Sequence, residues 1–285
     1  MNVPFKVNLK DRVALVTGGG GVLCSTMSRA LAACGAQIAV ADLKQEAAEA
    51  VAVQIRKEGG NAIGVACNVL EKESLAAAND RVKRELGPID ILINGAGGNH
   101  PKGTTSLEHL RKEDLAGAAR EITTFYDLDP KSIEFVFNLN FLGTLLPTQA
   151  FTREMAGKGK GTVINISSMN AFRPLTKIPA YSGAKAAVSN FTQWLAVHFS
   201  KVGVRVNALA PGFFLTEQNR TLLTKPDGSP TPRASTIISH TPMGKFGVPE
   251  DLVGALLWLT SEEASGFVTG VVIPIDGGFA AFSGV

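Results

Sequence analysis

The segment from residue 12 to Asp42 limits the possible fold more than any other stretch of this chain. An apolar run over 12–16 leads into the turn TGGGG at 17–21, and helical periodicity follows over about 22–33. A second apolar run, 37–41, ends at Asp42. A strand, a glycine turn, a helix and a second strand closed by an acid, in that order, form the parallel unit that binds dinucleotides. The segment therefore predicts an α/β fold.

The alternation of strand and helix continues to the end of the sequence. Further strands are expected over 62–66, 89–93, 162–166, 204–210 and 270–275, with helices over 44–58, 73–86, 133–152, 184–196 and 249–260 between or beside them. Because strands and helices alternate, the sheet should be parallel and doubly wound, with helices on both faces. We expect a single Rossmann-type domain over 1–285, with polar inserts at about 98–130 and 213–246 near the substrate site.

Composition argues against several classes of protein. The chain has 285 residues, 45% of them apolar, which is ample for one packed core. The net charge of +3 comes without a long basic stripe, so we expect no nucleic-acid partner. No apolar run approaches the length of a membrane span, and residues 1–12 lack the apolar part of a signal peptide. Three cysteines without a C-x-x-C pair favour reduced thiols in the cytoplasm.

The glycine turn and Asp42 together predict a dinucleotide cofactor. Glycines let the backbone approach a pyrophosphate, and the N-terminus of the following helix stabilises its negative charge. An acid at the end of the second strand accepts hydrogen bonds from ribose hydroxyls and repels a 2′-phosphate. Asp42 therefore favours NAD over NADP. A flexible turn followed by a surface aspartate is the alternative interpretation.

Two more strand ends carry candidate cofactor contacts. Asn68 follows the strand at 62–66, where its amide is placed to meet an adenine; a turn-capping role is equally compatible with the sequence. The turn NGAG at 94–97 follows the strand at 89–93. Its small residues lie beside the expected path of the cofactor, unless the segment is only a turn.

Tyr181 and Lys185 are a candidate acid/base pair. They are four residues apart at the start of the helix predicted over 184–196, so they lie on one face. A phenol has a pKa of about 10, and a nearby positive charge lowers it by stabilising the phenolate. Lys185, helped by a cationic cofactor ring, is placed to do this. Ser168 follows the strand at 162–166 and puts a hydroxyl at the edge where open α/β sheets bind ligands. A Tyr–Lys pair on a solvated helix face is the alternative.

Three polar residues near these motifs are candidates for further roles. Asn99 and His100 directly follow the turn at 94–97, and His100 is either a substrate contact or an ordinary surface histidine. Asn140 lies in an apolar helix, where it either holds a water that links Lys185 to solvent or bends or caps the helix. The two histidines at 100 and 109 do not have metal-site spacing, so we expect no metal.

Together these motifs resemble the short-chain dehydrogenase/reductase family, from about Leu9 to the end of the chain. The resemblance implies that Tyr181 is the general acid/base and that Lys185 lowers its pKa and binds the nicotinamide ribose. It also implies that Ser168 binds the substrate oxygen and that Asn140 positions a relay water. The residues that would line the cofactor are Gly18, Gly20, Gly21, Val22, Leu23, Asp42, Asn68, Val69, Asn94, Ala96, Gly97, Tyr181, Lys185, Pro211, Gly212 and Phe214.

The sequence departs from the family pattern at three places. The glycine turn usually reads T-G-x-x-x-G-x-G, and here Val22 and Cys24 stand at its last two glycines. Gly21 is the residue that would serve instead in a shifted turn. Gly95 stands where a second asparagine is usual, and Asn68 stands where aspartate is commonest. These departures bear on the phosphate geometry and the adenine contact.

A narrower resemblance is to the D-mannonate oxidoreductases, or fructuronate reductases, of this family. It rests on the segments GGGGVLC at 18–24, NGAGGNHP at 94–101, SMNAF at 168–172 and PGFF at 211–214. It implies interconversion of D-mannonate and D-fructuronate with NAD. Another sugar acid or a polyol, as in gluconate-type enzymes, is the alternative substrate, and a catalytically silent NAD-binding sensor is the alternative class.

A sugar acid needs hydrogen-bonding side chains and a cation for its carboxylate. The expected substrate contacts are Asn99, His100, Ser168, Asn170 and Arg220, with Gln218 and Asn219 in the same loops and Arg173 or Arg233 as alternative cations. By the resemblance the protein is a homotetramer. Its interfaces would involve the helices around Asn140 and Tyr181 and the last strand, and Trp194 and Trp258 fit burial either there or in the core.

Overall fold

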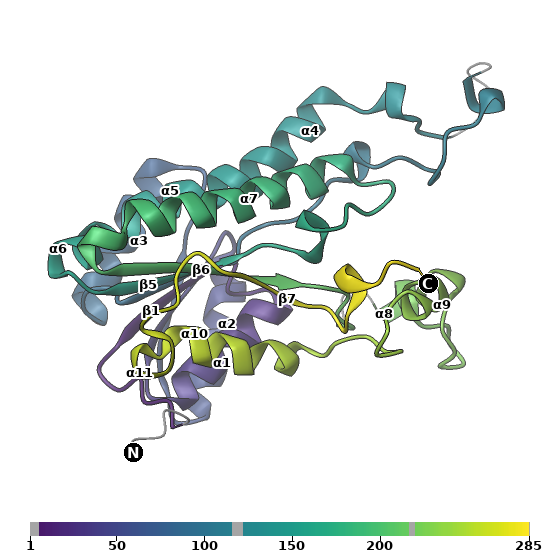
Figure 1. The fold of residues 1–285 in the computed structure, drawn as a ribbon. Coiled ribbons are helices and arrows are strands. Elements are labelled where there is room, and N and C mark those ends of the chain that lie inside the picture. The colour runs from purple at the N-terminus through teal and green to yellow at the C-terminus, as the bar shows by residue number, and fades with distance from the viewer. Residues whose placement is uncertain (1–5, 116–121, 217–219, 285) are drawn as a thin grey trace.

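The computed structural model describes residues 6–115, 122–216 and 220–284. Within them, seven parallel strands form one sheet in the order β3-β2-β1-β4-β5-β6-β7 (Figure 1). The strands are β1 (Val13–Thr17), β2 (Gln37–Asp42), β3 (Asn61–Ala66), β4 (Ile91–Asn94), β5 (Gly161–Ile166), β6 (Val204–Pro211) and β7 (Val272–Ile275). The predicted doubly wound Rossmann-type fold is confirmed.

Helices cover both faces of the sheet (Figure 1). One face carries α1 (Val22–Ala33), α2 (Gln45–Lys57) and α10 (Val253–Thr260); the other carries α3 (Lys72–Glu85), α5 (Gly143–Phe151), α6 (Arg153–Lys158) and α7 (Pro179–His198). Successive side chains of a strand point to opposite faces. Val16 of β1 therefore lies in the core under α1 and α10, and Leu15 lies in the core under α3 and α7.

The sheet topology brings the predicted motifs to one edge. The strand order reverses at β1, which pairs with β2 on one side and β4 on the other, and ligands bind at such a point in open α/β sheets. Thr17 is the register partner of Asn94, and Asn94 is the register partner of Asn165. The ends of β1, β4 and β5 are therefore level, and the turns that follow them lie side by side.

The long helix predicted over 133–152 is present as continuous helical backbone over 130–151, but it is not a regular α-helix throughout. The structure has α4 (Pro130–Phe137), a π-helical turn (Asn138–Leu142) and then α5. Asn140 lies in the π turn, where its side-chain Nδ2 donates to the carbonyl oxygen of Val136 at 2.7 Å. A π turn holds one extra residue per hydrogen-bonded ring, so it re-aims the side chains that follow.

The two inserts project beyond the carboxyl edge of the sheet (Figure 1). The described part of 98–130 contains the 3₁₀ turns Pro101–Gly103, Lys112–Leu115 and Phe125–Asp127. The segment 213–246 was expected to be irregular, but it forms α8 (Arg220–Leu223) and α9 (Pro232–Ser239). Its apolar side chains make a small cluster of their own: Phe213, Leu215, Leu223, Ala234, Ile237 and Phe246.

The chain closes with α11 (Glu262–Ser265), β7 and a 3₁₀ turn over Phe279–Ala281. Among the helices described, none combines the length and apolar character that crossing a membrane requires.

We predict that Gly203→Ala destabilises the fold by about 2–4 kcal/mol. Gly203 has a φ of +65°, and a Cβ built there would lie 2.0 Å from the carbonyl oxygen of Gly159. The free energy of unfolding in urea measures the effect. Gly157→Ala in α6 is the matched control, because nothing lies within 4 Å of its built Cβ. Equal stability of the two variants would contradict the prediction.

Candidate active site

Tyr181, Lys185 and Ser168 come together at the carboxyl edge of the sheet. Tyr181 and Lys185 lie one turn apart on α7, with Nζ of Lys185 5.6 Å from the centroid of the Tyr181 ring. Ser168 follows β5 and hydrogen-bonds Tyr181 through its side chain. The Ser168 Oγ also accepts from the backbone N–H of Asn170 at 3.2 Å, as the N-cap of the 3₁₀ turn Met169–Ala171. The predicted proximity of the three side chains is present.

Lys185 is held in place as a buried cation. Only 3% of the residue is exposed, and its Nζ donates to the carbonyl oxygen of Ile166 at 2.7 Å. Burial disfavours the charged form and lowers the pKa of Lys185 to about 8. The ammonium therefore points to the end of β5 and not to solvent.

The pKa of Tyr181 differs from the expectation. Lys185 was expected to lower it with help from a cationic cofactor ring. In the structure, burial raises the pKa of Tyr181 above its usual value, and the hydrogen bond with Ser168 offsets this only in part. Desolvation of the phenolate thus outweighs the protein's own stabilising contacts, so the chain alone favours a protonated tyrosine.

Asn140 links the π turn to the segment after β4. Its side-chain Nδ2 donates to the carbonyl oxygen of Gly98 at 2.7 Å, and its Oδ1 accepts from the N–H of Gly98 at 3.2 Å. A Cβ built on Gly97 would lie 2.7 Å from Oδ1 of Asn140 and 3.2 Å from Nζ of Lys185. Asn140 is therefore close to Lys185, as the relay role requires, and it lies within the π turn between α4 and α5.

The turn after β1 fits a dinucleotide. Gly18 has a φ of +62°, and a Cβ there would lie 2.9 Å from Cα of Ala96, so only glycine suits the position. Helix α1 starts at Val22, with Gly21 as its N-cap and no acidic residue in its first turn. In the described chain, no acceptor pairs with the N–H groups of Val22, Leu23 and Cys24. Free amides at a helix N-terminus are what a pyrophosphate needs.

Asp42 is oriented toward this turn. Its Oδ2 accepts from the N–H of Gly20 at 3.1 Å, and its Oδ1 accepts from the N–H of Lys44 at 3.1 Å. The carboxylate is thereby fixed at the end of β2, beside the glycines. A ligand with an additional phosphate at this point would meet a negative charge.

Asn68 and Asn94 use their side chains within the protein. Asn68 donates to Glu71 at 2.8 Å and accepts from the N–H of Leu70. These contacts correspond to the turn-capping alternative, and the adenine contact stays a prediction. Asn94 is buried, and its Nδ2 donates to Thr148 and Asn165, each at 2.9 Å. Its side chain therefore ties β4 to β5 and α5, which leaves its backbone as the part near the cofactor turn.

The remaining predicted cofactor residues offer mainly backbone. Gly212 follows β6, donates to the carbonyl oxygen of Ile275 at 2.9 Å and packs closely on Asp276. Pro211, Val69 and Phe214 are buried: Val69 packs on Gly143, and Phe214 packs on Gly247.

The predicted substrate residues differ in their present partners and in their exposure. Asn99 donates to Thr104 at 3.0 Å, and Nδ1 of His100 accepts from the N–H of Lys102 at 3.3 Å. The His100 ring also packs edge-on against Phe135. Asn170 is buried beside Ser168, whereas Arg220 is exposed at the start of α8. Gln218 and Asn219 lie outside the described residues.

Thr17 has a role that the sequence interpretation missed. Its Oγ1 accepts from the N–H groups of Gly95 and Ala96, at 3.1 and 3.3 Å. It thereby holds the turn after β4 against the end of β1. The position of Thr17 directly before the glycine turn could have marked it as a functional residue, but the sequence does not reveal which turn its hydroxyl binds.

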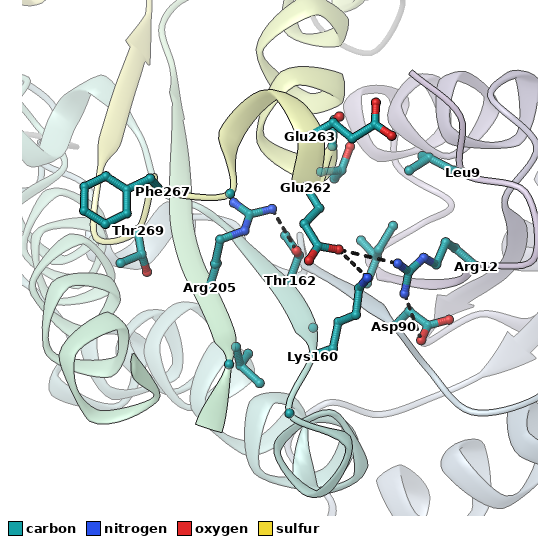
Figure 2. A pocket seen from close by; sticks show the side chains of 18 of the residues that line it. Leu9, Arg12, Asp90, Lys160, Thr162, Arg205, Glu262, Glu263, Phe267 and Thr269 are labelled. Atoms are coloured by element: carbon teal, nitrogen blue, oxygen red, sulfur yellow. Dashed lines mark hydrogen bonds and ion pairs between the residues drawn. The ribbon is translucent and has the colours of Figure 1, made fainter. Parts of the chain in front are cut away.

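A cavity of about 670 Å³ lies at the opposite edge, at the amino ends of β1, β4, β5 and β6. Figure 2 shows Arg12 and Lys160 directed at Glu262, and Arg12 also directed at Asp90. Arg205 donates to Thr162 and to two backbone carbonyl oxygens. The three basic side chains of this cavity thus already have partners within the protein. In the described part of the chain, no group of three His, Cys, Asp or Glu side chains is arranged to hold a metal ion.

Comparisons with known proteins place this site in context. The family model described as short chain dehydrogenase matches residues 12–227. An uncharacterized oxidoreductase of Haemophilus influenzae is 56% identical over 285 residues, which cover 100% of this chain and 99% of that protein. A Haemophilus influenzae structure provisionally named D-mannonate oxidoreductase, with bound NAD, has a TM-score of 0.93, 55% identity and full coverage of both chains. A Burkholderia cenocepacia gluconate 5-dehydrogenase in complex with NADP and tartrate has a TM-score of 0.83 and 30% identity, covering 99% of this chain and 100% of that one.

We predict that Lys185→Met stabilises the folded protein near pH 7. The folded pKa of Lys185 is about 8, against 10.5 when solvated, so the desolvation penalty is fully present below pH 8. Between pH 8 and 10.5 the unfolded chain binds more protons than the folded one, so wild-type stability rises with pH. The Lys185→Met variant also loses the hydrogen bond to Ile166, which offsets part of this relief. Its free energy of unfolding at pH 7 should therefore exceed that of wild type by about 1–2 kcal/mol.

Urea unfolding of wild type and Lys185→Met from pH 7 to 10 measures this difference, which should shrink as the pH rises. Lys201→Met, at an exposed lysine, is the control and should differ little from wild type at any pH. A Lys185→Met protein less stable than wild type at pH 7 would refute the prediction.

Proposed function

We propose that this chain, which belongs to the short-chain dehydrogenase family of NAD(P)-dependent oxidoreductases, interconverts D-mannonate and D-fructuronate with NAD. The observation that carries the chemistry is the Tyr181–Ser168 hydrogen bond with the buried ammonium of Lys185 beside it. The substrate assignment is supported by full-length similarity to a structure that bears the provisional name D-mannonate oxidoreductase.

In the oxidative direction, Ser168 and Tyr181 bind the hydroxyl that becomes the ketone. Tyr181 accepts its proton as the hydride leaves the same carbon, so one O–H bond and one C–H bond break while the C=O bond forms. NAD⁺, when bound, would supply the acceptor for this hydride. Lys185 stabilises the phenolate form of Tyr181, and a water beside Asn140 would carry the proton onward. In the reverse direction, protonated Tyr181 donates to the ketone oxygen, and the raised pKa of Tyr181 suits this step.

NAD is the proposed cofactor because of Asp42. Its carboxylate is anchored by the N–H groups of Gly20 and Lys44, so it cannot easily turn away from an added phosphate. The NAD-bound relative of 55% identity supports this choice, although the gluconate 5-dehydrogenase of 30% identity binds NADP. The free amides of Val22, Leu23 and Cys24 would hold the pyrophosphate.

Arg220 is the proposed partner of the substrate carboxylate. It starts α8 in the insert at the carboxyl edge. Arg173 is the alternative: it follows the turn capped by Ser168, and its Nε donates to the carbonyl oxygen of Ala280 at 3.1 Å. Arg233 on α9 is the third candidate. Asn99, His100 and Asn170 would bind substrate hydroxyls, for which Asn99 and His100 would exchange their present partners.

A gluconate-type enzyme is the second candidate function, favoured by the similarity to gluconate 5-dehydrogenase. A catalytically silent NAD-binding sensor is a weaker alternative, because the complete Ser168, Tyr181 and Lys185 set would then have no use.

We extend the proposal to a cytoplasmic homotetramer. All three cysteines are free, in keeping with a reducing compartment. Trp194 is 57% exposed in the single chain and stacks on His198 at 4.7 Å, and Trp258 is 40% exposed. Neither tryptophan belongs to the core, so of the two predicted locations an interface is the better supported.

Purified protein should form NADH from D-mannonate and NAD⁺ at mildly alkaline pH, and Tyr181→Phe should lower kcat by about 10³-fold or more, because it removes the proton acceptor. NADH absorbance measures the rate, with gluconate and a polyol panel in parallel. NADP⁺ should give a markedly lower kcat/KM than NAD⁺.

Turnover of gluconate or a polyol but not mannonate would discard the substrate and keep the mechanism. Equal rates for wild type and Tyr181→Phe would discard the role of Tyr181. NADH binding without turnover of any substrate would favour the sensor.

Arg220→Ala should raise KM for D-mannonate by about tenfold or more and leave KM for NAD⁺ unchanged, because a charge-assisted hydrogen bond to the carboxylate is lost. Arg84→Ala, at an arginine 70% exposed on α3, is the matched control. An unchanged KM for mannonate would exclude Arg220, and the same assay on Arg173→Ala and Arg233→Ala would then identify the cation.

A further inference from the structure

We propose that Cys24 and Gly95 form a positioning pair that sets the distance between α1 and the turn after β4. Through that turn, the pair fixes the backbone that contacts Asn140 and Lys185. The proposal concerns cofactor binding and hydride transfer in this chain, so it does not depend on which substrate the enzyme takes.

Gly95 has no room for a side chain. A Cβ built on it would lie 2.3 Å from Sγ of Cys24 and 2.8 Å from the carbonyl oxygen of Thr17. The same atom would lie 3.8 Å from Cβ of Cys24, which is ordinary contact. The sulfur atom of Cys24 therefore occupies the space that a side chain at residue 95 would need.

Cys24 acts here as a packing group. It lies in the first turn of α1 and is 6% exposed. Burial raises the pKa of its thiol to about 12, so the sulfur stays neutral and inert near pH 7. Its position, directly against the Gly95 backbone, ties the helix that faces the cofactor to the end of β4.

The turn after Gly95 transmits this contact to the catalytic groups. The N–H groups of Gly95 and Ala96 donate to Thr17, and Ala96 is packed against Gly18. Two residues after Gly95, the backbone of Gly97 lies against Oδ1 of Asn140 and Nζ of Lys185. Gly98 then exchanges hydrogen bonds with Asn140. A shift of residue 95 therefore moves the contacts of Asn140 and Lys185.

The sizes of the two residues are complementary. The side chain at residue 24 leaves no room for one at residue 95. Cys24 is where the sequence departs from the pattern of the glycine turn, and Gly95 is where it departs from the pair of asparagines. The two departures are therefore one coupled change. Interiors are packed densely enough that an added methyl group must displace its neighbours.

A double-mutant cycle on the whole protein tests the coupling, with NADH fluorescence titration giving Kd and steady-state assays giving kcat and KM. Gly95→Ala should raise the Kd for NADH by about tenfold or more and also lower kcat, because the new methyl group meets the sulfur. Cys24→Ala alone should change both much less. Cys24→Ala combined with Gly95→Ala should recover a large part of the loss, although the contact with Thr17 remains.

Cys24→Val approaches the same contact from the other side and should mimic Gly95→Ala, so the test survives if Gly95→Ala does not fold. Gly157→Ala is the glycine control. Thermal unfolding of every variant measures general destabilisation. The pH profile of kcat/KM measures displacement of Tyr181 and Lys185. Wild-type NADH affinity in both Gly95→Ala and Cys24→Val, or a double variant no better than the sum of the single ones, would overturn the proposal.

Discussion

The active-site edge depends on one desolvated ammonium group. Removing a charged amine from water costs several kcal/mol, and the lowered pKa of Lys185 expresses that cost. The carbonyl oxygen of Ile166, at the end of β5, accepts its hydrogen bond. Two residues later Ser168 bonds Tyr181, which lies one turn before Lys185 on α7. One strand end thus anchors both the cation and the phenol. Because two such attachments hold α7 at its N-terminal part, the phenol of Tyr181 has a defined position before any ligand binds.

The strand ends around this site are fastened to one another by polar side chains. Thr17 holds the turn after β4, while Asn94 bonds Asn165, which in turn donates to Thr192 of α7 at 2.9 Å. The two asparagine bonds are buried and the Thr17 bond is partly buried, so an unmet partner would carry much of the desolvation penalty of its group. They therefore specify the relative height of β1, β4 and β5 more strictly than backbone pairing alone. The level strand ends are what allow the cofactor turn, the turn after β4 and Ser168 to face one another.

The order of strands, helices and motifs was predictable from the sequence, because period and turn residues are local properties. The convergence of Ser168 and Tyr181 at the strand ends follows from that order, whereas the register partnership of Thr17 with Asn94 does not. Other features depend on tertiary contacts and were missed. The π turn at Asn140 cannot be distinguished from a regular helix by apolar spacing. The direction of the Tyr181 pKa depends on how much water the fold excludes. The irregular appearance of 213–246 concealed α8 and α9, since their apolar cluster is too small to impose a clear period. In the sequence, Cys24 and Gly95 are two separate departures from the family pattern, because their contact depends on the tertiary fold.

The two edges of the sheet differ in how many polar groups they leave without a partner in the described chain. This difference indicates the position of the active site better than the volume of a cavity does. At the amino edge there is ample volume, but Arg12 and Lys160 are paired with Asp90 and Glu262, and Arg205 is bonded to carbonyl oxygens. A ligand there would have to break contacts that the protein already makes. At the carboxyl edge the amides that start α1 have no acceptor within the described chain, and an ammonium lies under a phenol that burial keeps protonated. Donors without partners gain most from a ligand, because binding removes a penalty that the folded chain carries. The dinucleotide and the substrate are therefore expected at the edge with the unmet groups.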